Sequence, residues 1–123
     1  MVNLLIIFAA VFGFLGVALG AFGAHGLQHM VEAKQLAVWH TGVQYQMYHS
    51  LALLAVALLA INYLNQTLAH WAGWAFVIGI LLFSGSLYAI VLLGVKNLGV
   101  ITPIGGLFFL AGWALLLIAA IKK

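Results

Sequence analysis

Apolar residues run through this chain in four stretches of about 20 residues, separated by short polar segments. The stretches cover approximately residues 4–24, 43–64, 71–93 and 103–121. A helix that crosses the hydrocarbon core of a bilayer needs about 20 apolar residues. The pattern therefore predicts an all-α integral membrane four-helix bundle, with four transmembrane helices in a single transmembrane domain over residues 1–123. Short connections make neighbouring helices antiparallel, so we expect both termini on the same side of the membrane.

Turn residues and aromatic residues mark the ends of these predicted spans. Residues 62–70 read as a polar turn, and Thr102 followed by Pro103 fits an N-cap and a first helical position. We therefore expect the fourth span to begin at Pro103. Amphipathic rings near span ends favour the headgroup level of the bilayer. The aromatic residues expected to act as anchors are Trp39, Tyr63, Trp71 and Trp74.

Composition strengthens the membrane assignment and removes some functions. The chain is 67% hydrophobic and 4% charged, whereas about a quarter of the residues of a soluble domain are charged. The expected partner is therefore the lipid bilayer. The net charge of +3 comes from four scattered lysines that form no basic stripe, so we expect no nucleic-acid partner. Two lysines flank each predicted face, which leaves the membrane orientation open.

Small residues recur every three or four positions along the first span. Gly13, Gly16 and Gly20 are expected on one face of that helix, because this spacing follows the helical repeat. A face of this kind allows two helix backbones to approach closely in lipid. The face is expected to seat another helix of the same chain, and the alternative is a seam of a homo-oligomer.

A polar interfacial segment, about residues 25–42, separates the first two spans and leads into an unusual helix. We expect this helix to begin near Glu32 and to end near Asn62, with a polar first half that enters the bilayer. At 100° per residue, one half of it carries six polar or aromatic side chains that should face protein. They are His40, Thr41, Gln44, Tyr45, Tyr48 and His49. Trp39, Gln46 and Ser50 lie on the opposite side.

The first span leaves the membrane close to this polar face. Residues 20–26 are too rich in glycine for a rigid continuation of the first helix, and His25 falls at its exit within plausible reach of the face. The candidate ligand-binding residues are therefore His25, Gln44, Tyr45, Tyr48 and His49. We expect this cluster either to lock the bundle or to bind a small ligand or a lipid. His49 stands out, because an ionisable residue deep in a span indicates a functional site.

Other functions remain as alternatives to this binding or locking cluster. A transporter or channel component would need a water-accessible path through the bundle. His25 and His29 have an i, i+4 spacing that suits a metal or haem site, but Gly26 weakens the helix between them and further ligands would have to come from elsewhere. We expect no metal and no cofactor.

Catalysis has few groups available in this chain. Glu32 is the only acidic residue and there is no cysteine, so neither a carboxylate pair nor a Ser/His/Asp triad is at hand. Serines in membrane helices commonly form hydrogen bonds across helices instead. We therefore predict no catalytic residues and a protein that is not an enzyme.

Four motifs resemble one known family along essentially the whole chain. They are residues 20–27 (GAFGAHGL), 42–49 (GVQYQMYH), 83–88 (FSGSLY) and 101–106 (ITPIGG). The chain resembles the bacterial membrane family of domain of unknown function 423 (UPF0382), and it is similar to eukaryotic transmembrane protein 256. The resemblance implies a small, multi-pass, four-span protein of the bacterial plasma membrane with no assigned molecular function.

The same resemblance bears on the candidate site. His25, Tyr45, Tyr48 and His49 match the recurring motifs of the family. His40 stands where the family pattern has a different polar residue. The resemblance therefore implies a shared site without His40.

Overall fold

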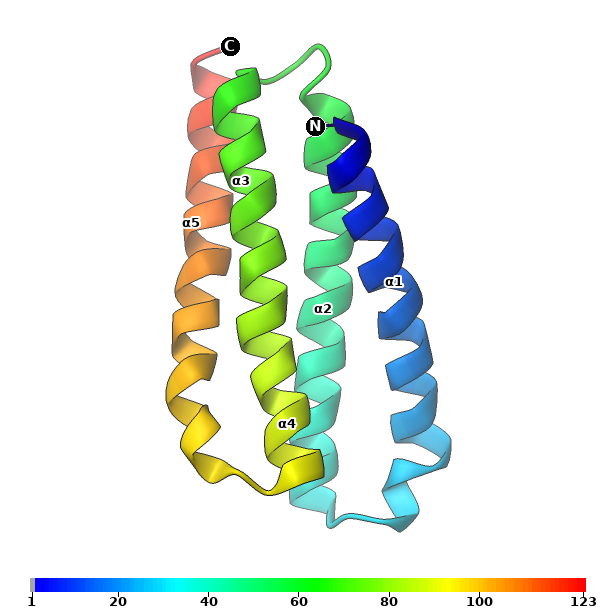
Figure 1. Ribbon diagram of the computed structural model, residues 1–123. Coiled ribbons are helices and arrows are strands. Elements are labelled where there is room, and N and C mark those ends of the chain that lie inside the picture. Colours follow the sequence, from blue (N-terminus) through cyan, green and yellow to red (C-terminus); the bar gives the residue numbers. More distant parts are fainter. Residues whose placement is uncertain (1) are drawn as a thin grey trace.

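The computed structural model describes residues 2–123, so Met1 of the predicted domain lies outside the described residues. The described residues form helices and no strand. Figure 1 shows these helices packed side by side and antiparallel, with both termini at the same end. The elements are α1 (Val2–His25), η1 (Leu27–His29), α2 (Ala33–Leu59), α3 (Gln66–Gly79), η2 (Ile80–Ser84), α4 (Gly85–Leu93), η3 (Lys96–Val100) and α5 (Ile101–Ile121).

Three of the long helices are apolar and long enough to cross a membrane. They are Asn3–His29, Gln66–Leu93 and Lys96–Ile121. The second of these joins α3, η2 and α4 into one rod, with η2 as a π-helical turn in its middle. Helix α2 is as long as its neighbours but is not among the three, because its first half carries many polar residues. The all-helical prediction is confirmed, and the fourth membrane crossing stays a prediction.

A side chain caps the start of α3, whereas α5 begins without such a cap and earlier than we predicted. The Asn65 side chain caps α3 by accepting a hydrogen bond of 3.1 Å from the backbone N–H of Leu68. Helix α5 begins at Ile101, so the prediction that it begins at Pro103 with Thr102 as its cap is wrong. The Thr102 hydroxyl instead bonds the Ser86 hydroxyl of α4 at 2.6 Å, because a neighbouring helix offers it a partner.

The glycines of α1 lie against α2 of the same chain. A Cβ added at Gly20 would lie 3.2 Å from Val43, and one at Gly23 would lie 2.7 Å from the Trp39 ring. A Cβ at Gly16 would collide with the Met47 side chain. The prediction of an intrachain seat is confirmed at these positions.

The same packing explains why α1 continues as a helix to His25. The prediction that residues 20–26 interrupt the helix is wrong, because close contact with α2 outweighs the low helix propensity of glycine. At Gly13, a Cβ would meet no atom within 4 Å among residues 2–123. Association between copies of the chain through this position stays a prediction.

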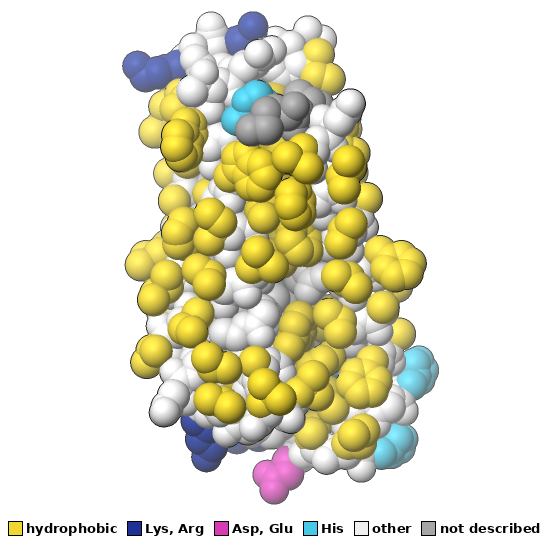
Figure 2. Space-filling model, in the orientation of Figure 1, with side chains coloured by type: hydrophobic (Ala, Val, Ile, Leu, Met, Phe, Trp, Pro, Cys, Tyr) yellow, Lys and Arg dark blue, Asp and Glu magenta, His cyan; other side chains and the backbone are white. Residues whose placement is uncertain are grey.

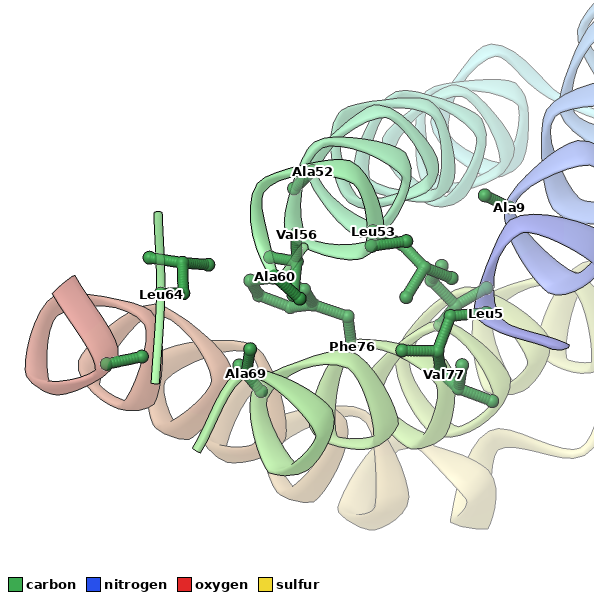
Figure 3. Packing of buried hydrophobic residues seen from close by; sticks show 14 of the residues in the cluster. Leu5, Ala9, Ala52, Leu53, Val56, Ala60, Leu64, Ala69, Phe76 and Val77 are labelled. Carbon is green, nitrogen blue, oxygen red and sulfur yellow. The ribbon is translucent and has the colours of Figure 1, made fainter. Parts of the chain in front are cut away.

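The hydrophobic core lies near the end of the bundle that holds the termini. Figure 3 shows Leu5 of α1, Leu53 of α2 and Val77 of α3 pointing toward one another, with Phe76 beside them. Hydrophobic side chains also cover the outside of the bundle along most of its length, and lysines appear only at its two ends (Figure 2). A surface of this kind fits a lipid environment better than water.

Candidate functional site

The buried polar groups of the bundle gather along one side of α2. Gln46 is 3% exposed, and its amide group joins three helices. The Gln46 Nε2 donates to the backbone carbonyl of Phe12 in α1 at 2.8 Å, and the Tyr88 hydroxyl of α4 donates to Gln46 Oε1 at 2.6 Å. Since an unpaired amide is costly away from water, these bonds fix the side chain between its neighbours.

His49 lies one turn further along α2 and contacts α5. Its Nδ1 donates to the carbonyl of Tyr45 at 2.8 Å, and Trp113 Nε1 donates to its Nε2 at 3.1 Å. A carbonyl only accepts and an indole N–H only donates, so these partners select the neutral imidazole with its proton on Nδ1. The ring also stacks on Phe109, with centroids 3.6 Å apart and planes 8° from parallel.

Trp39 adds a third connection near the start of α2. Its Nε1 donates to the Leu19 carbonyl of α1 at 2.9 Å, and its ring lies 4.7 Å from that of Tyr88. The side chain is 1% exposed, so the prediction that Trp39 is an interfacial anchor is wrong. We call Trp39, Gln46 and His49, with the groups that they bond on α1, α4 and α5, the polar ladder.

A serine joins α2 to the π-helical turn at the same level of the bundle. The Ser84 hydroxyl donates to the Gly42 carbonyl at 2.6 Å and is fully buried. Gly105 of α5 lies against the other side of this turn, where an added Cβ would be 2.8 Å from the Cα of Phe83. The turn is thus packed between two helices at close range. π-Helical turns are frequent at functional sites.

The predicted cluster is only partly brought together. His49 is buried, and the Tyr45 ring packs 4.7 Å from that of Phe83 while remaining 39% exposed. Tyr48 is 56% exposed and Gln44 is exposed too. The prediction that this face of α2 points at protein is therefore wrong for His40, Gln44 and Tyr48, which are exposed because α2 turns its other side toward α1 and α4.

His25 lies apart from the other candidate residues. It is exposed at the last turn of α1, and the neighbouring Gly23 packs on Trp39, ten residues before His49 on α2. Ten helical residues span about 15 Å, so His25 and His49 do not share a site. The i, i+4 geometry of His25 and His29 is also lost, since α1 ends at His25 and a separate 3₁₀ turn carries His29.

Several residues of the polar ladder were not among our candidates. The sequence pattern puts Gln46 and Trp39 on the side away from protein, and it does not indicate Tyr88 or Trp113 as partners. Ser50 belongs to the same missed side, and its hydroxyl donates to the Gln46 carbonyl at 2.6 Å. Trp39, Gln46 and Ser50 are seven and four residues apart, a spacing that places them on one helical face and indicates a second polar face of α2.

The hydrogen bonds of the polar ladder support a structural role. The ladder pairs neutral donors with neutral acceptors, mostly between helices, and its amide and imidazole groups already have partners. Residues 2–123 contain no group of three or more His, Cys, Asp or Glu side chains that could hold a metal ion. The arrangement can therefore fix the positions of α1, α4 and α5 around α2.

Comparisons with known proteins agree with this description of a helical membrane protein. The family model described as "Protein of unknown function (DUF423)" matches residues 19–106. The UPF0382 membrane protein YwdK of Bacillus subtilis is 49% identical over 117 residues, which are 95% of each chain. A UPF0382 membrane protein of Haemophilus influenzae is 48% identical over the whole chain and 98% of its own length.

A more distant relative carries a location in its name. The UPF0382 inner membrane protein YgdD of Escherichia coli is 43% identical over 121 residues, which cover 96% of this chain and 89% of its own. No solved structure matches the chain. The similarity to YwdK and YgdD extends over nearly the full length of each protein, so this chain belongs to the DUF423 (UPF0382) family of membrane proteins, whose molecular function is unassigned.

Proposed function

We propose that this chain is a non-enzymatic protein of the bacterial plasma membrane that crosses the bilayer four times as a single domain. In this proposal, α2 is the inner, polar span, and the polar ladder holds the other helices around it. The observation that carries the proposal is the amide of Gln46, which is buried and bonded to both α1 and α4. The polar ladder thus acts as a lock on the bundle, and of the cluster predicted from the sequence only His49 belongs to it.

The packing of α2 against α1 supports a fourth crossing. Gly23 of α1 contacts Trp39, Gly20 contacts Val43, and Phe12 bonds Gln46, so the two helices run antiparallel at the same level. Helix α2 has 27 residues, or about 40 Å of length, against a hydrocarbon core of about 30 Å. If α1 crosses the membrane, α2 has the length and the position to cross beside it.

Three of the polar side chains that lower the hydropathy of α2 do not face the outside of the bundle. Gln46, His49 and Ser50 are buried inside the bundle, where hydrogen bonds satisfy them. Its second half exposes leucines to the outside, among them Leu51 and Leu58. Polar groups inside a membrane are tolerated when they face the bundle interior and find partners there.

The number of crossings is tested by the location of the two termini. Four crossings place the N- and C-termini in the same compartment, and three crossings, with α2 outside the bilayer, place them in opposite compartments. Reporter fusions at each end of the chain, one active only inside and one only outside the cell, distinguish these outcomes. Termini in opposite compartments would overturn the proposal.

Cysteine labelling provides an independent control, because the chain has no cysteine of its own. Single cysteines at Gln28 and Gly99 should react with a membrane-impermeant reagent from one side of the membrane. A cysteine at Asn62, in the turn between α2 and α3, should react from the other side. Reaction of Gln28 and Asn62 from the same side, with Gly99 reacting from the other, would contradict a crossing by α2.

A further inference from the structure

A charged cavity lies at the end of the bundle opposite the termini. It is formed where the start of α2 meets the end of α4 and the η3 turn, and its volume is about 450 Å³. Gly94 ends α4 in the left-handed conformation, with φ of 69°, and the chain then turns to place Lys96 in the cavity wall. The lining residues are Glu32, Lys34, Gln35, Val38, Ile90 and Lys96.

The lining changes from charged to apolar along the axis of the bundle. Lys34 and Lys96 are exposed at the outer end, and Val38 lies one helical turn deeper than Lys34. Ile90, from the last turns of α4, gives a second apolar wall. A phospholipid has the same order of groups, with a charged headgroup above acyl chains. The proposed crossing of α2 puts the two lysines at headgroup depth.

Gln35 lines this cavity and carries a hydrogen-bond acceptor that has no partner among the described residues. This acceptor is its Oε1, which is buried. A buried acceptor without a partner is costly, so a ligand that offers a hydroxyl donor is favoured here. Together with two ammonium groups, this acceptor suits a ligand that combines a phosphate with hydroxyl groups.

We propose that this cavity binds the headgroup of an anionic phospholipid of the phosphatidylglycerol type. The phosphate lies between Lys34 and Lys96, the glycerol hydroxyls face Gln35 and Glu32, and the acyl chains pass Val38 and Ile90. Two lysines and one glutamate leave the lining with a net charge of +1, which favours an anionic lipid over a zwitterionic one. This inference goes beyond the proposed function, because the polar ladder involves none of these residues.

Native mass spectrometry of the detergent-solubilised full chain tests the proposal, with phosphatidylglycerol and phosphatidylethanolamine of equal acyl chains as probes. A lysine near anionic lipid contributes about fivefold to binding, so the double variant K34Q/K96Q should bind phosphatidylglycerol about 30-fold more weakly. The matched control K122Q/K123Q removes the same charge from the other end and should leave binding within about twofold. Exposed lysines can be changed without disturbing the core.

Three results would overturn the proposal. The first is an unchanged preference for phosphatidylglycerol in K34Q/K96Q, or an equal loss in K122Q/K123Q. The second concerns Glu32→Gln, which should strengthen binding of an anionic lipid because it removes a negative charge. Loss of phosphatidylglycerol binding in this variant, together with a preference for phosphatidylethanolamine, would contradict the proposal. The third is displacement of the lipid by soluble glycerol 3-phosphate at equal concentration, which would show that the acyl chains contribute nothing.

Discussion

Replacing Gln46 by methionine should destabilise the bundle by removing the centre of the polar ladder. Methionine has a similar length and shape but neither donates nor accepts a strong hydrogen bond, so the substitution leaves little cavity. It removes the bond of 2.8 Å to the Phe12 carbonyl and the bond of 2.6 Å from the Tyr88 hydroxyl. The change therefore isolates hydrogen bonding between helices from packing.

The expected magnitude follows from the number of bonds lost. Hydrogen bonds between membrane helices contribute about 0.6 kcal/mol on average and up to about 1.7 kcal/mol each. Two bonds at Gln46 therefore give a loss of about 1–3 kcal/mol in the free energy of unfolding. Gln46 is 3% exposed, which places its bonds toward the upper part of this range.

The assay is equilibrium unfolding of the purified chain in mixed micelles, with denaturing detergent titrated in and helicity followed by circular dichroism. Gln44→Met is the matched control, because Gln44 lies on the same helix with its side chain exposed. This control should not lower the free energy of unfolding by more than about 0.5 kcal/mol. A double-mutant cycle of Gln46→Met with Tyr88→Phe should give a coupling energy of about 0.6–1.7 kcal/mol.

One pair of results would refute the reasoning. If Gln46→Met is as stable as the unaltered chain, and its coupling with Tyr88→Phe is zero within error, the ladder does not lock the bundle. A loss of equal size in Gln44→Met would point the same way, since it would show a general effect of removing glutamine from α2.

Two further pairs of substitutions test the packing and the histidines, with the same unfolding assay. Gly105→Ala should lower the free energy of unfolding by about 1–3 kcal/mol, because its Cβ would lie 2.8 Å from the Cα of Phe83. Gly106→Ala should be nearly neutral, because its Cβ would lie 4.0 Å from the Phe83 ring. Equal effects would contradict the close approach of α5 at Gly105. His49→Leu should lower the free energy of unfolding by about 1–2 kcal/mol, because the Trp113 indole N–H loses its acceptor. His25→Leu, at the exposed end of α1, should change this free energy by less than about 0.5 kcal/mol. Similar losses at both histidines would mean that they belong to one structural unit after all.

The helical pattern and the glycine seat of this protein were readable from the sequence because both depend on local periodicity. Apolar stretches gave four helices, and the three- to four-residue spacing of Gly16 and Gly20 gave the face that packs on another helix. The low hydropathy of α2 was also visible as a polar first half. These features need no knowledge of which helix lies next to which.

Local periodicity does not predict which of the two polar sides of α2 is buried. Gln44 and Tyr48 lie on one side and Gln46 and Ser50 on the other, so periodicity alone supports either side as the buried one. The deciding partners of Gln46 are the backbone carbonyl of Phe12 and the side chain of Tyr88, which is 42 residues away along the chain. A carbonyl in α1 leaves no trace in the residue type at that position.

The sequence by itself therefore determined that this is an all-helical membrane protein with a polar second helix and a family resemblance that the comparisons confirm. The tertiary structure decided which polar residues of α2 are buried, separated His25 from His49, and extended α1 and α5 beyond their expected ends. The physical reason is that hydropathy and helix propensity act along the chain, whereas the burial of a polar group depends on a hydrogen-bond partner that only the packed bundle supplies.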